Sequence, residues 1–400
     1  MEVSFMDKNI LVISESLTGG GAERVAANLS DELSNVYNLY LLILNDKEQT
    51  YSTNSNVIHL GIKPPTSFFS KIMWYFKALN RVKKIKKTLN ITHTISFLSK
   101  PDLLNVLTGT NNKTIVSVRN KRSSLNRNFF NKIKDKYIFN KADYIVSLSV
   151  GVKDDLIKFY GINSEKIEVI YNACDLEKIE IMAKENPYDI VDFNPTKGCT
   201  VITAGRLINQ KGQWHLIRAF KKVVNFLPNV KLYILGQGEE KEYLSSLIND
   251  LGLSDSVKIL GYKKNPYSYL SRCDLFVFSS LYEGFGNILL EAMACSLPII
   301  STDCLVGPRE LLEPNSSYDD TLVEEAKNCE YGILVPVFDG VKYSASDKLT
   351  SQEEIMADKI IEVLRDKKIL KKYKNKSKTR ILNFDKVAII NNWVNVINKL

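Results

Sequence analysis

Residues 200–226 read TVITAGRLINQKGQWHLIRAFKKVVNF. The opening residues 200–204 are apolar or β-branched, which is typical of a strand buried on both faces of a parallel sheet. A glycine-containing turn follows, and residues 212–226 then place apolar side chains at helical spacing. A buried strand, a turn and a covering helix form the repeating unit of doubly wound α/β folds.

This unit recurs along the chain. Strands are expected at 9–14, 39–44, 57–60, 94–97, 114–118, 144–149, 167–171, 200–204, 230–235, 257–260, 275–279, 298–301 and 332–336. Helices are expected at 22–34, 68–89, 101–108, 126–139, 150–159, 212–226, 240–251, 266–271, 286–294, 352–365 and 384–400. The alternation predicts an α/β protein with two Rossmann-like, doubly wound domains facing each other across a cleft.

A stretch with turn chemistry and little periodicity, residues 185–198, separates the two series. We therefore expect a first domain at 1–185, a second at 186–380, and a C-terminal amphipathic helix at 381–400. Two domains and a tail agree with the length of 400 residues.

The composition is that of a soluble globular protein, with 44% hydrophobic and 25% charged residues. No apolar run approaches the ~18 residues of a membrane-spanning helix, and the N-terminus lacks the features of a signal peptide. The six cysteines form no Cys-x-x-Cys pair, which favours buried free thiols over a zinc site. These features predict a cytoplasmic protein.

Positive charge is concentrated in one region of a chain whose formal net charge is +9. From Lys63 to Lys141 there are 18 Lys and Arg against two acidic residues, a balance of 18 − 2 = +16. Such a segment suits anionic lipid, nucleic acid or a phosphate-bearing substrate. A solvated basic face is the alternative.

A glycine-rich turn, Gly19-Gly20-Gly21, follows the first expected strand. Glycines allow close approach of a ligand to the backbone, and the next helix offers N–H groups and the positive end of its dipole. The spacing is not the Gly-x-Gly-x-x-Gly of dinucleotide-binding turns. The segment indicates an anion-binding turn, with a plain tight turn as the alternative.

A second segment, residues 205–212, reads GRLINQKG and follows the strand at 200–204. Arg206 and Lys211 thus lie at the carboxyl end of a parallel strand, where open α/β sheets bind ligands. A guanidinium and an ammonium together suit a diphosphate. Ordinary surface charge is the alternative.

A third segment, residues 283–291, reads EGFGNILLE and follows the expected strand at 275–279. Gly284 and Gly286 free the backbone, so the amides of residues 285–288 can hold an anion at the start of a helix. A nearby carboxylate can accept hydrogen bonds from a ribose diol. The pair Glu283 and Glu291 is also compatible with acid–base hydrolysis of a glycoside.

Together these segments resemble the retaining glycosyltransferases of family 4, which have the two-domain GT-B architecture. The matching stretches are GGAERV at 20–25, GRLINQKG at 205–212, LGQG at 235–238, EGFGNILLEAMA at 283–294, LPIISTDC at 297–304 and GPRE at 307–310. They span most of the chain in family order. The resemblance implies that the C-terminal helix crosses back to the N-terminal domain.

The resemblance implies a role for each matching residue. Arg206 and Lys211 hold the donor diphosphate and stabilise the departing nucleotide. Glu283 contacts the donor sugar, Glu291 binds the ribose hydroxyls, and Tyr262 lies in the segment against the base. The remaining donor-binding positions are Gly20, Gly21, Gly205, Gly236, Phe285, Gly286, Asn287 and Ile288.

Two departures from the family pattern concern the transferred sugar. Where many members carry a histidine after the strand at 114–118, this chain has Arg119-Asn120, which become the candidate acceptor and sugar contacts. Leu305-Val306 replaces smaller residues before Gly307, which leaves the sugar unidentified. The chain has no Asp-x-Asp motif, so we expect a metal-independent enzyme without a cofactor.

The implied reaction is hexosyl transfer with retention from a nucleotide-sugar, a UDP-sugar by analogy, to a lipid-linked saccharide. Bacterial members of this kind build capsule or O-antigen. Aromatic residues at 68–76 precede basic residues at 81–87, which suits peripheral attachment to the anionic inner face of the plasma membrane. The alternative for these aromatic residues is that they belong to the core. The alternatives for the function are a nucleotide-sugar epimerase of the same fold and a non-enzymatic protein that binds nucleic acid or membrane.

Overall fold

The computed structural model describes residues 8–18, 21–45, 51–109, 111–123, 129–187, 193, 195, 199–304, 306–316 and 321–400. The chain forms two compact units. Unit 1 contains residues 1–172 and 387–400, and unit 2 contains residues 173–386, so the chain passes between them twice.

The first division falls earlier than the boundary expected near residue 185. The cause is an unexpected short helix, α6 (Leu176–Ala183), which packs against α9 (Tyr267–Leu270) and α10 (Asn287–Ala294) of unit 2. Asn265 Nδ2 also donates to the carbonyl of Met182 at 2.8 Å. These contacts assign the segment to the second unit.

Unit 1 is built on a parallel seven-stranded sheet in the order β3-β2-β1-β4-β5-β6-β7. Its strands are β1 (Asn9–Ser14), β2 (Asn38–Ile43), β3 (Asn56–His59), β4 (His93–Phe97), β5 (Lys113–Val118), β6 (Tyr144–Ser147) and β7 (Ile167–Val169). In β1, Ile10 and Val12 join the core on one face, while Leu11 and Ile13 join the core on the other. Both faces are therefore buried, as the apolar strands predict.

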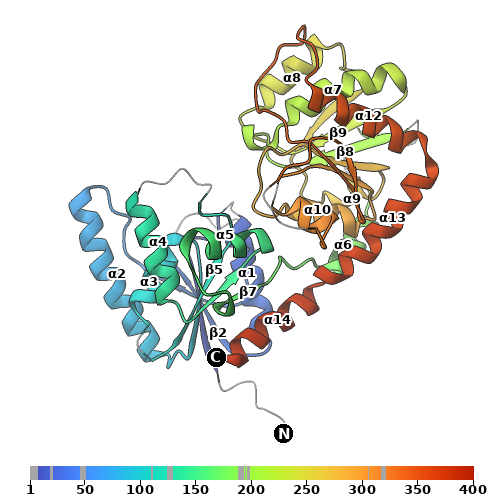
Figure 1. Cartoon of the computed structure of the whole chain (residues 1–400). Coiled ribbons are helices and arrows are strands. Elements are labelled where there is room, and N and C mark those ends of the chain that lie inside the picture. The colour runs from blue at the N-terminus through green and yellow to red at the C-terminus, as the bar shows by residue number, and fades with distance from the viewer. Residues whose placement is uncertain are drawn as a thin grey trace. The chain divides into compact units, whose positions relative to one another are not determined.

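Helices cover both faces of this sheet (Figure 1). They are α1 (Gly21–Leu33), α2 (Phe68–Thr88), α3 (Ser99–Leu107), α4 (Phe129–Lys141), α5 (Val150–Tyr160) and the C-terminal α14 (Lys386–Lys399). Trp393 and Ile397 of α14 share a core with α1, and the Trp393 ring lies 6.4 Å from the Phe97 ring. Lys8 Nζ also donates to the carbonyl of Ile397 at 2.8 Å. The C-terminal helix thus completes the core of unit 1.

Unit 2 repeats the architecture with the strand order β10-β9-β8-β11-β12-β14-β13. Its strands are β8 (Thr200–Ala204), β9 (Lys231–Leu235), β10 (Val257–Gly261), β11 (Leu275–Phe278), β12 (Ile299–Thr302), β13 (Lys327–Asn328) and β14 (Ile333–Val335). Only β13 among these strands runs antiparallel, and it was not expected because it has two exposed residues.

The helices of unit 2 include α6, α9 and α10, and the others are α7 (Gln213–Phe226), α8 (Lys241–Asp250), α11 (Pro308–Leu312), α12 (Ser351–Arg365) and α13 (Lys367–Ile381). The short α11 was not expected, since five residues carry no measurable periodicity. The main core packs α7, α8 and α12 on one face of the sheet. The prediction of two Rossmann-like α/β domains is confirmed.

Candidate active site

The carboxyl ends of β8 and β11 meet in the middle of the unit 2 sheet. β8 pairs with β9 on one side and with β11 on the other, and among the parallel strands chain order runs outward in both directions from this point. Loops that follow two such strands leave on opposite sides of the sheet, which opens a crevice between them. The segments 205–212 and 279–286 are these two loops, so the fold brings together regions 70 residues apart in sequence.

Hydrogen bonds join the two loops. The amide of Leu281 donates to the carbonyl of Gln210 at 2.9 Å, and Ser279 Oγ donates to the carbonyl of Lys211 at 2.9 Å. Gly212 adopts a left-handed conformation with φ 55°, and a Cβ there would lie 2.5 Å from the Ser279 carbonyl. Only glycine fits where residue 212 approaches the β11 loop so closely. This close approach holds the neighbouring Lys211 at the crevice.

Lys211 and Glu283 form the central charged pair. Lys211 Nζ lies 2.5 Å from Glu283 Oε1, and their side chains are 15% and 8% exposed. The same Nζ lies 5.1 Å from the centre of the Phe278 ring. Because both side chains keep some exposure to solvent, an anion entering the crevice can compete with Glu283 for the ammonium.

Arg206 supplies a second cation from the same loop. Its side chain is exposed, and within the described residues its guanidinium has no ion-pair or hydrogen-bond partner. Its carbonyl accepts a hydrogen bond from Gln213 Nε2 at 3.1 Å, which fixes the backbone beneath it. One paired and one unpaired cation at one strand end can bind two phosphate groups.

Glycines let the loop after β9 cross the loop after β8 without intervening side chains. The amide of Gly205 donates to Leu235 and that of Leu207 donates to Gln237, both at 2.9 Å. A Cβ on Gly236 would lie 1.8 Å from the Gly205 carbonyl, with φ at +149°. The backbone contact therefore requires glycine at position 236, whereas a Cβ on Gly205 would meet only the Lys211 side chain, at 3.4 Å.

The start of α10 has the backbone arrangement that the sequence predicts. Gly286 precedes the helix in a left-handed conformation with φ 86° and supplies no capping side chain. The Phe285 side chain is buried and its ring lies 6.2 Å from the Phe384 ring. Only the backbone of Phe285 can therefore contact a ligand, whereas Asn287 and Ile288 are half-buried.

Glu291 and Tyr262 come from two further elements of unit 2, α10 and the segment after β10. Glu291 is half-buried on α10, with the Tyr267 hydroxyl 3.5 Å from its Oε1. Tyr262 follows β10, the edge strand of the sheet, and its side chain is 67% exposed.

Unit 1 has an equivalent point between β1 and β4. Glu15, directly after β1, forms an ion pair with Lys100 of α3. Gly21 begins α1, and Gly20 lies outside the described residues. Leu98, between β4 and α3, has φ +75°, an uncommon conformation for a branched residue that often marks functional loops.

Arg119 and Asn120 follow β5 as expected, but they differ in accessibility. The Arg119 side chain is buried, donates to Ser117 Oγ at 3.4 Å and to Asn172 Oδ1, and lies over the Phe97 ring. Burial lowers the pKa of Arg119 to about 9. Half-buried Asn120 is the more accessible of the two.

A buried ion pair that the sequence analysis missed supports the loop after β12. Arg309 Nε donates to Asp303 Oδ1 at 2.9 Å, and the amide of Val323 donates to Asp303 Oδ2 at 3.1 Å. This loop carries Gly307, where a Cβ would lie 2.1 Å from the Phe285 carbonyl. The sequence contains a clue to this pair, because the acidic Asp303 directly follows β12 and the basic Arg309 lies in the first turn of α11.

Two further properties bear on the chemistry. Within the described residues no three His, Cys, Asp or Glu side chains are grouped to hold a metal ion, and no helix there is long and apolar enough to cross a membrane. The cysteines are unpaired, and burial raises the pKa of Cys295 and of Cys304 to about 12. Both thiols are therefore protonated near neutral pH.

The loop before Gly307, where the sequence departs from the family pattern, is described in part. Val306 is buried, and Leu305 lies outside the described residues.

Two family models match the chain, one on each half. Residues 19–178 match "Glycosyltransferase Family 4", and residues 190–330 match "Glycosyl transferases group 1". The chain is therefore a glycosyltransferase and belongs to the family 4 type with the GT-B fold. The resemblance found in the sequence is confirmed.

Relatives extend this match over nearly the whole chain. The chain is 33% identical, over 94% of its length and 95% of the relative, to the Campylobacter jejuni enzyme named N-acetylgalactosamine-N,N'-diacetylbacillosaminyl-diphospho-undecaprenol 4-alpha-N-acetylgalactosaminyltransferase. It is 35% identical, over 80% of its length and 84% of the relative, to an uncharacterized glycosyltransferase of Methanocaldococcus jannaschii.

A solved structure shows the same fold. Anabaena HepE, in a crystal structure in complex with UDP, superposes with a TM-score of 0.76 at 20% identity, over 98% of this chain and all of HepE.

Proposed function

We propose that this glycosyltransferase transfers a hexosyl group with retention from a UDP-sugar to a lipid-linked saccharide. The observation that carries the donor half is the crevice of unit 2, where Arg206 and the pair Lys211–Glu283 lie at the switch point between β8 and β11. Two cations suit the diphosphate, and a carboxylate beside them suits sugar hydroxyls. The UDP complex of HepE, which has the same fold, supports this choice of donor.

Each part of the crevice then has a role. Arg206 and Lys211 bind the diphosphate, and the backbone around Gly286 contacts it at the start of α10. Glu283 accepts hydrogen bonds from the donor sugar, and Glu291 accepts them from the ribose diol. Exposed Tyr262 lies against the base. Glycine at positions 205 and 236 adds no side chain at the crevice.

The reaction breaks the bond between the anomeric carbon and the diphosphate oxygen. The acceptor hydroxyl attacks from the face that the diphosphate leaves, and the departing phosphate oxygen takes the hydroxyl proton. No protein base is required, so catalysis rests on stabilising the departing charge and on positioning. Arg206 and Lys211 perform this stabilisation, and Lys211 exchanges Glu283 for phosphate as the charge develops. The proposed reaction requires neither a metal nor a cofactor.

The acceptor half is supported by the Campylobacter relative, whose name specifies a diphospho-undecaprenol saccharide as its substrate. We assign the acceptor to unit 1, where half-buried Asn120 follows β5 and is the accessible candidate contact. The product is a longer lipid-linked glycan for bacterial surface polysaccharide such as capsule or O-antigen.

The proposal of membrane attachment rests on α2. Some of its aromatic residues are core residues and others are exposed, so each of the two expectations holds for part of the helix. Trp74 is buried in the core, but Phe69 and Phe76 are 74% and 62% exposed. Exposed lysines on the same helix complement an anionic surface. We place the protein at the cytoplasmic face of the plasma membrane as a peripheral enzyme.

Acceptor-dependent turnover tests the proposed function. Purified protein is incubated with UDP-sugars and polyprenyl-diphosphate saccharides, and mass spectrometry and anomeric NMR follow the products. We expect an extended lipid-linked glycan with the anomeric configuration of the donor. Conversion of the UDP-sugar to an isomer without acceptor would instead indicate an epimerase, and an inverted linkage would contradict the mechanism.

A further inference from the structure

A long connection of unit 2, residues 336–350, lies between β14 and α12 and reaches the two donor loops, residues 205–212 and 279–286. None of the residues of the 336–350 connection, all of which the structure describes, belongs to a helix or strand. Connections of more than about 12 residues without secondary structure are uncommon, and those that are ordered usually have a function. Side chains of α7 hold this connection in place, which favours a functional role.

Both ends of the 336–350 connection are tied to α7. Near its start, the carbonyl of Val341 accepts a hydrogen bond from Trp214 Nε1 at 2.9 Å. Near its end, the carbonyl of Lys348 accepts a hydrogen bond from Arg218 at 2.7 Å. Helix α12, which follows the connection, packs along α7 (Figure 1). The start of α7 is therefore the support on which this connection lies.

His215 lies between these two ties and is fully buried. Its ring stacks on the ring of Phe338, with the centres 4.5 Å apart. Its Nδ1 lies 2.8 Å from Oε1 of Glu353, which also accepts a hydrogen bond from Arg218 Nε at 2.9 Å. The carboxylate is the acceptor, so Nδ1 carries the proton. Its Nε2 lies 3.6 Å from Asp339 Oδ1 and has no hydrogen-bond partner within the described residues.

Stability alone does not explain a histidine at this position. Apolar residues of similar volume often replace a buried ionic network without loss of stability. An imidazole with one unpartnered nitrogen adds a cost of desolvation. The contact between the 336–350 connection and the donor loops offers another explanation.

The connection meets the donor loops at Leu281. A Cβ on Gly340 would lie 3.1 Å from Leu281 Cδ1, and a Cβ on Gly212 would lie 3.3 Å from Leu281 Cδ2. The Leu281 side chain therefore lies between the connection and the loop after β8. The amide of His215 also donates to the carbonyl of Gly212 at 3.1 Å. His215 thus contacts this junction through its backbone and, by way of the connection, through its ring.

We propose that His215 is a positioning residue for the donor site. Its ring holds the connection on α7, and the connection holds Leu281 against Gly212. Lys211 directly precedes Gly212 and Glu283 follows Leu281 by two residues, so this junction sets where the charged pair lies. His215 is buried, so it acts through these contacts and not on the donor itself. The inference rests on the proposed function for the identity of the donor, whereas the contacts do not depend on it.

Two substitutions at His215 separate positioning from packing. His215→Leu keeps an apolar volume, and Glu353 keeps Arg218 and the amide of Thr350 as donors, so no buried charge is left unpaired. His215→Asn retains an amide N–H group in place of Nδ1 and should restore the hydrogen bond to Glu353. Val223→Ala, at a buried position about two turns further along the same helix, is the control for lost packing.

Hydrogen–deuterium exchange of the two donor loops and calorimetric titration with UDP measure the effect, on the full chain and well below its unfolding temperature. We expect His215→Leu to speed up exchange in both loops and to weaken UDP binding at least tenfold, because small displacements of binding groups have large effects. His215→Asn should stay within threefold of the wild type. Val223→Ala should lower the thermal midpoint and leave the UDP affinity within twofold.

A second pair of variants acts on the same junction from the connection. Gly340→Ala places a Cβ against Leu281 at a φ of +75°, whereas Gly252→Ala has a φ of +66° and meets only Lys221 Nζ, at 3.9 Å. The backbone strain of the two variants is therefore similar. We expect faster exchange of residues 279–286 and weaker UDP binding in Gly340→Ala alone. Equal effects in the two variants would overturn the role of the junction.

The outcomes distinguish this inference from the proposed function. Unchanged exchange and UDP affinity in His215→Leu would overturn the inference, and so would equal losses in Val223→Ala or in His215→Asn. If the wild type binds no UDP, the proposed donor is refuted and the exchange data decide the positioning role. Faster exchange in His215→Leu that His215→Asn restores would then uphold this role, and unchanged exchange would refute it.

Discussion

The switch points of units 1 and 2 have the same topology and different chemistry. In unit 2 the β8 and β11 loops meet through glycine contacts and present Arg206 with the pair Lys211–Glu283. In unit 1 the pair Glu15–Lys100 occupies the corresponding point, and Lys100 lies 5.8 Å from the centre of the Trp74 ring. Loop residues rather than the sheet therefore set what each Rossmann-like unit binds.

The largest expected effect separates the stabilities of the two units. Trp393 of α14 is buried in the core of unit 1, so Trp393→Ala should destabilise that unit by about 4 kcal/mol. Unit 2 should be unaffected. Val387→Ala on the same helix, at a 62% exposed position, is the matched control.

Calorimetric scanning with and without UDP measures this effect. We expect one transition to move to lower temperature in Trp393→Ala while the UDP-stabilised transition stays in place. A shift of both transitions by the same amount would show that the two units unfold together.

A backbone contact in unit 2 gives the next largest effect. Gly236→Ala would place a Cβ 1.8 Å from the Gly205 carbonyl at a φ of +149°, which should cost about 3 kcal/mol and distort the crevice. Gly261→Ala at φ +75° meets no atom within 4 Å, so it isolates the conformational strain alone. Thermal melts and UDP titration should show a much smaller effect for Gly261→Ala. Equal losses of stability and UDP affinity in the two variants would contradict the importance of the contact at Gly236.

Substitution of one lysine at each switch point compares the roles of the two sites in the reaction. Lys211→Met should lower kcat about 100-fold, the order expected for losing a group that stabilises a developing charge. Lys100→Met removes the corresponding cation of unit 1 and should act mainly on the KM of the acceptor. Steady-state kinetics with both substrates varied measures the two effects. An unchanged kcat in Lys211→Met would remove Lys211 from the mechanism.

The last expected effect is a dependence of stability on pH, and it is small when expressed per pH unit. Burial raises the pKa of Asp102 from 3.8 to about 7, although Arg122 at 3.3 Å opposes the shift. Between pH 4 and 7 the folded state holds a proton that the unfolded chain has released. Stability should therefore fall as pH rises through this window, by at most about 1.4 kcal/mol per pH unit from this group.

Asp102→Asn should flatten this dependence. The difference in thermal midpoint between pH 5 and pH 8 should be smaller than in the wild type, and Asp250→Asn at an exposed position of α8 should leave it unchanged. The same pH dependence in all three proteins would contradict the assignment to Asp102.

The fold was predictable because its strands are short apolar runs separated by helices with clear periodicity. The elements that were missed have few residues, as in β13 and α11, or lie just before the expected linker, as in α6. The boundary near residue 185 depended on turn chemistry alone. Packing of α6 on unit 2 decided the division, and such packing has no local sequence pattern.

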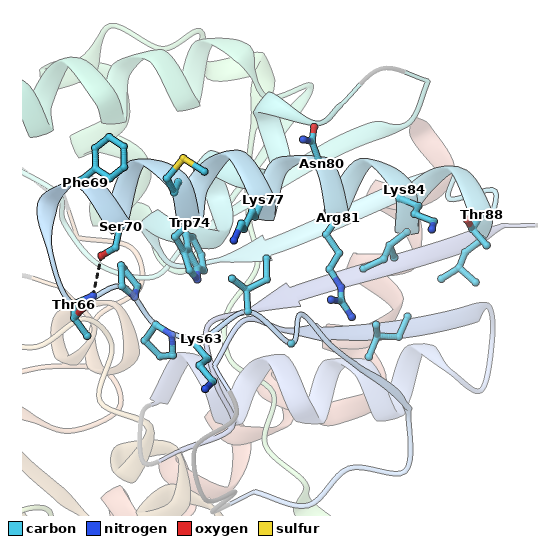
Figure 2. A pocket seen from close by; sticks show the side chains of 18 residues that line it. Lys63, Thr66, Phe69, Ser70, Trp74, Lys77, Asn80, Arg81, Lys84 and Thr88 are labelled. Carbon is cyan, nitrogen blue, oxygen red and sulfur yellow. Dashed lines mark hydrogen bonds between the residues drawn. The ribbon is translucent and has the colours of Figure 1, made fainter.

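The site was predictable where topology fixes which loops meet. Arg206, Lys211 and Glu283 follow strands that become neighbours, so their proximity follows from the doubly wound order. The burial of Arg119 depends on Asn172, a distant residue with no recognisable motif. A groove in unit 1 is lined by α2 and by the preceding segment of residues 58–66, whose path the sequence does not reveal (Figure 2).

Nucleotide titration tests the central claim that unit 2 holds the donor at its switch point. UDP, GDP and ADP are titrated into wild-type protein, Glu291→Ala and Arg206→Ala, with Arg365→Ala on the exposed end of α12 as the control. We predict selective UDP binding that is weakened at least tenfold in the first two variants and unchanged in the control. Undiminished UDP binding in both variants, or no nucleotide binding by the wild type, would contradict the claim.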